Sequence, residues 1–102
     1  MNQWTQAEAL ELCRMVETVA PTYGCHVALT GGLLYKDGPR KDCDLLFYRI
    51  RQVAEIDILG LWFALELIGL TLVRGSGWCC KATFSNKLVD CFFPEAEGGS
   101  YE

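Results

Sequence analysis

The chain has 102 residues, of which 51% are hydrophobic and 22% are charged, and its formal net charge is −4. These values predict one globular domain with a real core and no room for a second domain, and they exclude a disordered chain. The net charge also excludes the broad basic surface of a non-specific nucleic-acid binder, although a bound cation would reverse the sign locally. The longest apolar run, 58–73, is interrupted by Glu66 and is too short to predict a membrane span.

The chain begins with Met-Asn-Gln-Trp and leads directly into a helical pattern, so no signal peptide is expected and a cytoplasmic location is predicted. The single histidine, His26, is expected to be structural. There is no Cys-x-x-Cys pair, which argues against a zinc site. We expect all six cysteines to be reduced, several of them as small buried hydrophobic residues: Cys13, Cys25, Cys43, Cys79, Cys80 and Cys91.

The first predicted elements are a helix over 5–20 and a strand over 25–30. Thr5 and Glu8 have the spacing of a capping box, and the helix carries one apolar stripe before Pro21 ends it. The strand delivers the chain to Gly31-Gly32. A connection with an Asp-Gly-Pro turn follows, and its cations would lie on a solvated surface or attract phosphate: Lys36, Arg40 and Lys41.

Two acids open the next predicted strand, over 41–49. Alternate side chains of a strand share a face, so Asp42 and Asp44 project together, roughly 6–7 Å apart. Adjacent carboxylates repel each other unless a cation lies between them, and Mg²⁺ prefers hard oxygen ligands. Gly31-Gly32 leaves backbone free to approach a phosphate. With Asp90 in a later apolar run, these residues predict a site for phosphate and metal.

A second helix is predicted over 57–68, with Asp57 at its N-cap and Gly69 at its C-terminal turn. Apolar residues cover almost all of its surface, and Glu66 is its only charge after the cap. Such a helix is buried on two sides or covered by a second chain. Two-sided burial is hard to arrange in a domain of this size, so we expect a partner or a homo-oligomer.

Three short strands are predicted to follow as an antiparallel meander, over 70–74, 78–84 and 87–93. Gly75-Ser76-Gly77 and Ser85-Asn86 are the predicted turns. Lys81 would face either solvent or the acids, and we favour solvent. Pro94 closes the sheet, and 94–102 are predicted to form a mobile acidic tail.

The motif residues resemble a known family. Gly31-Gly32, nine further residues, Asp42-Cys43-Asp44 and a distant Asp90 resemble the nucleotidyltransferase superfamily of DNA polymerase β, most closely its minimal branch. The resemblance covers about 25–93. It implies an α+β fold of the polymerase β-like type, a small mixed β-sheet packed by helices, as a single domain over 1–93.

The resemblance also implies an activity: Mg²⁺-dependent transfer of a nucleoside monophosphate, with AMP expected, from a nucleoside triphosphate to a hydroxyl of a protein or RNA acceptor. Two magnesium ions would be held by the catalytic acids Asp42, Asp44 and Asp90. The residues assigned to nucleotide binding are Thr30, Gly31, Gly32, Lys41 and Lys81.

Small stand-alone members of this family are often antitoxins paired with a helical HEPN-type toxin, which some of them modify with AMP, so such a toxin is an expected partner. Two alternatives stay open. One is a non-catalytic binding module of the same fold, such as a phage or mobile-element protein that captures a host partner. The other is a metal- or nucleotide-responsive regulator without turnover.

The predicted strand faces can be tested by burial. If the acids point away from the core, then their neighbours point into it. The residues expected to be largely buried are Leu29, Cys43, Leu45, Phe47, Leu61, Leu65, Val89 and Cys91. An exposed Cys43 together with an exposed Cys91 would place the acids in the core and remove the site.

Overall fold

The fold is one mixed β-sheet with its two longer helices on one face. The computed structural model describes residues 3–36, 38–76 and 78–95. In chain order the elements are α1 (Gln6–Val19), the 3₁₀ helix η1 (Ala20–Tyr23), β1 (Cys25–Thr30), α2 (Gly32–Tyr35), β2 (Asp42–Arg49), α3 (Ile58–Leu67), β3 (Thr71–Ser76), β4 (Cys79–Phe84) and β5 (Lys87–Phe92). This arrangement confirms the predicted α+β class.

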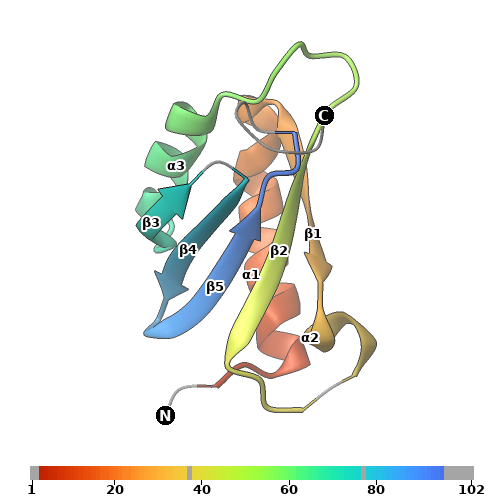
Figure 1. Cartoon of the computed structure of the whole chain (residues 1–102), viewed down its shortest axis with the longest axis vertical. Helices are drawn as coiled ribbons and strands as arrows, with labels where there is room; N and C mark the ends of the chain where they lie inside the picture. The colour runs from red at the N-terminus through yellow and green to blue at the C-terminus, as the bar shows by residue number, and fades with distance from the viewer. Residues whose placement is uncertain (1–2, 37, 77, 96–102) are drawn as a thin grey trace.

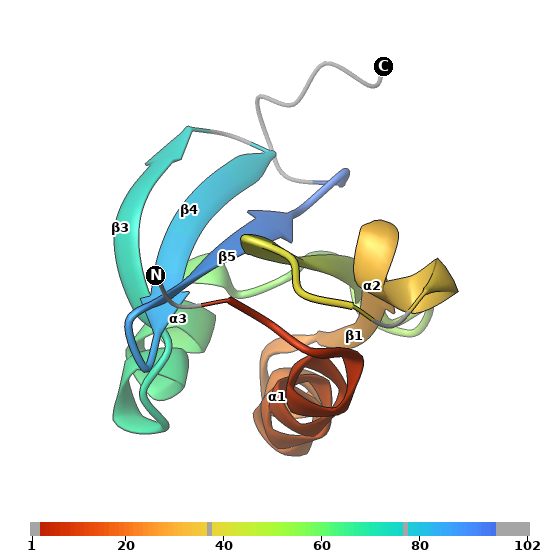
Figure 2. The same cartoon turned by 90° about the horizontal axis from the view of Figure 1, so that it is seen from below.

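The five strands lie in the order β1-β2-β5-β4-β3 (Figure 1). β2 and β5 are parallel, and all other neighbours are antiparallel, so the meander predicted for the last three strands is confirmed. Seen from below, α1 and α3 lie side by side under the sheet (Figure 2). We call the opposite side of the sheet the open face. It carries Asp42, Asp44, Leu88 and Asp90.

The core lies between the sheet and the helices α1 and α3. All eight residues predicted to form it are buried, and seven of them have no exposed surface at all: Cys43, Leu45, Phe47, Leu61, Leu65, Val89 and Cys91, with Leu29 at 8%. Because successive strand residues point to opposite faces, burial of Cys43 and Cys91 directs Asp42, Asp44 and Asp90 to the open face. The predicted strand faces are therefore correct.

The helix ends follow the predicted capping chemistry. At the start of α1, the Thr5 hydroxyl accepts from Glu8 N (3.2 Å) and the Glu8 carboxylate accepts from Thr5 N (3.0 Å), which completes the capping box. Asp57 caps α3 by accepting from Gly60 N at 3.1 Å. Gly69 follows α3 with a φ of +102°, in the region that only glycine adopts without strain.

Trp4 fixes the chain just before β2. Its side chain is 1% exposed, and its indole Nε1 donates to Leu88 O at 2.7 Å. Its backbone forms an isolated bridge with Arg40, two residues before β2 begins. The Lys87 ammonium lies 5.0 Å from the centre of the indole ring. Trp4 thus ties the N-terminal segment, the entrance of β2 and β5 together.

β3 is longer than predicted. It continues through Gly75 and Ser76, which the sequence analysis placed in a turn, and its pairing with β4 is irregular between Leu72 and Arg74. A Cβ on Gly75 would lie 2.8 Å from Cys80 Sγ, so the glycine is required by close packing on β4 rather than by a turn.

The second predicted turn is confirmed, because Ser85 and Asn86 have φ values of +51° and +64°, as a tight hairpin requires.

Some of the predicted features lie outside the described residues. These are Asp37 of the Asp-Gly-Pro turn, Gly77 of the first predicted turn, and 96–102, which make up most of the predicted tail.

All six cysteines are free, as expected. Burial raises the pKa of Cys25 to about 11 and that of Cys43 to about 12, and it raises the pKa of Cys91 well above its usual range. These thiols therefore stay protonated and pack as small apolar groups. No helix within the described ranges has the length and apolar character needed to cross a membrane.

Candidate functional site

Three carboxylates lie together on the open face, near the beginning of β2. The parallel pairing of β2 with β5 places Asp44 opposite Asp90 and Asp42 opposite Leu88. Asp42 is exposed, whereas Asp44 and Asp90 are half-buried. The structure therefore brings all three predicted acids to one region, although Asp44 and Asp90 are far apart in the sequence.

The electrostatics of this acid cluster are unfavourable without a cation. The pKa of Asp44 is raised, chiefly because burial penalises its charged form and then because Asp90 and Asp42 add negative charge beside it. A hydrogen bond between the Asp44 and Asp90 side chains raises it further, while Lys81 acts in the opposite direction. Such a cluster attracts positive charge.

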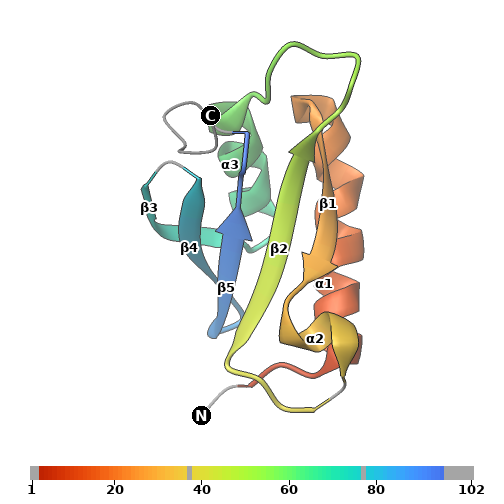
Figure 3. The same cartoon turned by 45° about the vertical axis from the view of Figure 1, so that its right-hand side comes forward.

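Gly31 leaves space for one of these acids. It has a φ of +75°, and a Cβ built there would overlap the Oδ2 atom of Asp44 and lie 2.9 Å from its Cγ. Any other residue would displace the carboxylate. A Cβ on Gly32 would lie 3.1 Å from Arg40 Nε, so the second glycine leaves room for the Arg40 guanidinium group. α2 then begins at Gly32, beside the start of β2 (Figure 3).

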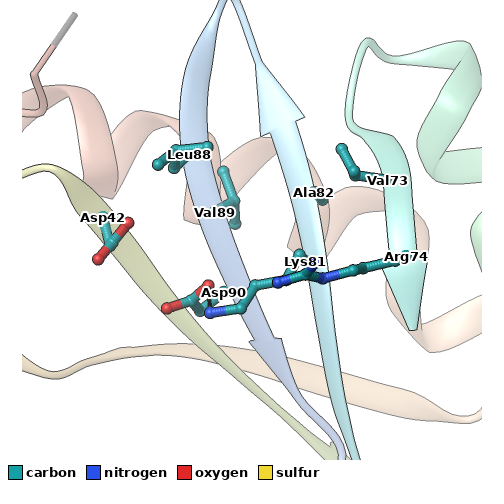
Figure 4. Close-up of a pocket in the computed structure, with 8 residues that line it drawn as sticks. All are labelled: Asp42, Val73, Arg74, Lys81, Ala82, Leu88, Val89 and Asp90. Atoms are coloured by element: carbon teal, nitrogen blue, oxygen red, sulfur yellow. Dashed lines mark hydrogen bonds and ion pairs between the residues drawn. The ribbon is translucent and has the colours of Figure 1, made fainter. Parts of the chain in front are cut away.

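The acids belong to a polar row that crosses the whole sheet. Consecutive register pairs join Thr30 of β1 to Asp44, Asp44 to Asp90, Asp90 to Lys81 of β4, and Lys81 to Arg74 of β3. With strands about 4.8 Å apart, each member neighbours the next. The row is negative on β2 and β5 and positive on β4 and β3. Figure 4 shows its last three members, Asp90, Lys81 and Arg74.

Lys81 is not simply directed to solvent, as the sequence analysis favoured. Its Nζ donates to Asp90 Oδ1 at 2.8 Å, although 46% of the lysine side chain is exposed. Hydrogen bonding to Asp90 raises the pKa of Lys81, so the ammonium stays charged. Lys81 is therefore paired with one member of the acid cluster.

A hollow of about 300 Å³ opens on the β4 and β3 side of the acids (Figure 4). Its polar lining consists of two acids, Asp42 and Asp90, and two cationic side chains, Arg74 and Lys81. The rest of its lining is apolar: Val73, Ala82, Leu88 and Val89. Neither Arg74 nor Leu88 was predicted to be a site residue. Only the strand register brings them to the acids, and no local pattern signals that register.

The other predicted nucleotide-binding residues lie around the opposite side of the cluster. Thr30 is half-buried beside Asp44, and Lys41 is exposed immediately before β2. Arg40, which was left between a surface and a phosphate role, lies against Gly32. The Glu17 carboxylate of α1 accepts a 2.6 Å hydrogen bond from His26 Nδ1, in keeping with the structural role expected for this histidine.

The donor chemistry of the cluster suits magnesium, because carboxylate oxygens are the ligands that this ion prefers, and Gly31 preserves the space that Asp44 occupies. Among residues 3–36, 38–76 and 78–95, however, no three acidic, cysteine or histidine side chains are grouped closely enough to hold an ion as they stand. Asp90 is engaged by Lys81 instead.

No protein-family model matches the chain, and no curated protein sequence matches it.

Proposed function

We propose that this protein is a magnesium-dependent nucleotidyltransferase with a polymerase β-like fold of the minimal type. The observation that carries the proposal is the Asp44–Asp90 register pair, with Asp42 on the same face and the Gly31 backbone against Asp44. Three carboxylates around one glycine loop, with cations beside them, suit a triphosphate and its metal ions. The antiparallel β1–β2 pair and the parallel β2–β5 pair support the fold assignment.

The reaction would move a nucleoside monophosphate from a triphosphate to a hydroxyl. The acceptor oxygen forms a bond to the α-phosphorus, the bond to the bridging oxygen breaks, and pyrophosphate leaves. Bound magnesium would supply charge neutralisation and lower the pKa of the acceptor hydroxyl. Asp42 and Asp44 would hold both ions, one of them beside the triphosphate at Gly31 and Gly32. Asp90 would help hold the second ion and receive the acceptor proton.

Positioning supplies most of the catalysis in such reactions. Gly31 keeps the Asp44 carboxylate in place, and Thr30 lies beside it at the end of β1. Lys41 at the entrance of β2 and Lys81 on β4 would attract phosphate oxygens from two sides. In this scheme the acceptor is a protein or an RNA, AMP is the transferred group, and modification of a HEPN-type toxin in the cytoplasm is the biological role.

The proposal is tested by incubating the purified chain with Mg²⁺ and each α-labelled nucleoside triphosphate, with candidate protein and RNA acceptors. We expect label on one acceptor band, and loss of that label in Asp42→Asn and Asp44→Asn. Glu66→Gln on α3 removes a carboxylate away from the site and should leave labelling unchanged. Equal labelling by wild type and Asp44→Asn would reject the proposed mechanism.

A second candidate function, a non-catalytic binding module, is favoured by the surface of α3. Leu59, Phe63 and Leu67 are 85%, 70% and 77% exposed, and their spacing of four residues places them on one stripe of the helix. This stripe agrees with the partner or homo-oligomer expected from the sequence. Capture of a partner that is lost in Phe63→Ser but retained in Asp44→Asn, without any labelling, would support the binding module instead.

A further inference from the structure

Lys81 places a cation of the chain itself within the acid cluster. Its Nζ lies 2.8 Å from Asp90 Oδ1, and the Asp90 side chain is only 13% exposed. The strand register puts Lys81 on one side of Asp90 and Asp44 on the other. Asp90 therefore has an ammonium group on one flank and a carboxylate on the other.

The ammonium group and a metal ion at Asp90 would compete. Both are attracted to the same carboxylate oxygens, and two cations a few ångströms apart repel each other strongly in a half-buried site. Asp42 and Asp44 both stand on β2, two strands away from Lys81 in the register, so Lys81 obstructs a first ion there less than it obstructs one at Asp90. An ion that also requires Asp90 can bind well only after Lys81 has moved.

We propose that Lys81 is a positioning residue that occupies Asp90 in the metal-free site and so controls when a second divalent cation binds. This inference rests on the proposed function and assigns a role to a residue within the same site. Lys81 can leave because nearly half of its side chain is exposed and because the adjoining hollow offers room (Figure 4). In the resting site its charge partly neutralises the acids.

The position of Arg74 indicates that an anion would release Lys81 from Asp90. Arg74 is the register partner of Lys81 on β3 and lines the same hollow. Its positive charge disfavours movement of the ammonium toward β3 unless an anion lies between the two groups. A phosphate group entering the hollow would attract both cations, draw Lys81 away from Asp90 and free the carboxylate. Binding of phosphate and of the second cation would therefore be coupled.

The test is titration of the nucleotide-free protein with MnCl2, followed by calorimetry and by electron paramagnetic resonance, which counts free Mn²⁺. We expect wild type to bind one ion well and a second ion weakly. Lys81→Met should tighten the second site about tenfold or more, because one competing charge has gone. Lys81→Arg should leave the second site as weak as in wild type or weaker, because a guanidinium pairs with a carboxylate through two bonds.

Arg14→Met is the matched control. It removes one positive charge from an exposed position on α1, where Arg14 pairs only with Glu11 of the same helix at 3.6 Å in the described contacts. Mn²⁺ binding should be the same as in wild type. Asp90→Asn combined with Lys81→Met should abolish the gained affinity, because the second ion then lacks its carboxylate.

The possible failures are distinct. Equal Mn²⁺ affinities in wild type, Lys81→Met and Lys81→Arg would overturn the role of Lys81 and leave the proposed function standing. No Mn²⁺ binding by any variant would overturn both. Circular dichroism checks that each variant is folded, and Lys81→Gln, which keeps a polar end group, replaces Lys81→Met if the latter unfolds.

Discussion

At the scale of single residues, the site depends on the absence of one side chain. Gly31 combines a positive φ with direct contact between its backbone and the Asp44 carboxylate. A residue with a Cβ at this position meets two penalties, backbone strain and overlap with Oδ2. The two can be separated, because Gly38 also has a positive φ, of +147°, but a Cβ there would meet nothing within 4 Å.

We therefore expect Gly31→Ala to lower the free energy of unfolding by about 2 to 4 kcal/mol and to abolish Mn²⁺ binding at Asp44. Gly38→Ala carries the strain alone and should lower the free energy of unfolding by about 1 kcal/mol, with Mn²⁺ binding unchanged. Urea denaturation and Mn²⁺ titration measure both effects. Equal losses of stability in the two variants would show that the contact with Asp44 has no energetic importance.

The raised pKa of Asp44 predicts that stability depends on pH in an unusual direction. Its pKa in the folded state is raised above the usual value of 3.8, so between that value and the folded pKa the native state binds more protons than the unfolded state. The contribution of Asp44 to stability therefore falls as pH rises through this window. In metal-free buffer, Asp44→Asn should unfold at higher urea concentration than wild type at pH 7, and the difference should shrink toward pH 3.5.

Glu66→Gln is the control for this measurement, because Glu66 is exposed on α3 and remote from the acid cluster. A smaller advantage of Asp44→Asn at pH 7 than at pH 3.5 would contradict the assigned direction of the pKa shift.

At the scale of the elements, α3 presents two opposite surfaces with similar chemistry. Leu65 is fully buried against the sheet, while Leu67, two residues later, is 77% exposed. We expect Leu65→Ala to lower the free energy of unfolding by about 2 to 4 kcal/mol and Leu67→Ala by less than about 0.5 kcal/mol. Thermal and urea unfolding of the isolated chain measure both. A large loss in Leu67→Ala would show that the exposed stripe is covered in solution.

The elements were predictable from sequence because their signals are local. The capping box of Thr5 and Glu8, the alternation from Asp42 to Phe47 and the Ser85-Asn86 turn each lie within a few residues. Gly75 was misassigned because a glycine required by packing against Cys80 looks the same in a sequence as a glycine required by a turn. The buried stripe of α3 was also predictable, because Leu61 and Leu65 lie four residues apart on one face, and both have no exposed surface.

The site was predictable only in part, and the missing part is the register. The motif of a glycine pair, Asp-x-Asp and a distant Asp indicated the three acids, but the contacts of Lys81 and Arg74 depend on which residues of β3, β4 and β5 are paired. A shift of one residue would turn Lys81 into the core face. The anchoring role of Trp4 likewise depends on Leu88, 84 positions later in the chain, with no signal near either residue.

At the scale of the whole molecule, ion binding and folding should be coupled. The acids converge only in the folded sheet, so a divalent cation that binds there stabilises the native state. With Mg²⁺ at ten times its dissociation constant, we expect a gain of about 1.4 kcal/mol, which would raise the melting temperature of a domain of this size by about 6–11 °C. Asp42→Asn/Asp44→Asn should show no such rise in differential scanning fluorimetry.

The parallel pairing of β2 with β5 also has a consequence for the newly made protein. Asp44 is synthesised well before its partner Asp90, and at ribosomal rates of about 5–20 residues per second the interval is roughly 2 to 9 s. During this time the nascent chain carries the glycine loop and the first two acids but no complete site. Chains that stall or are cut before β5 would lack the third acid, so the acid cluster would be complete only when the sheet is finished.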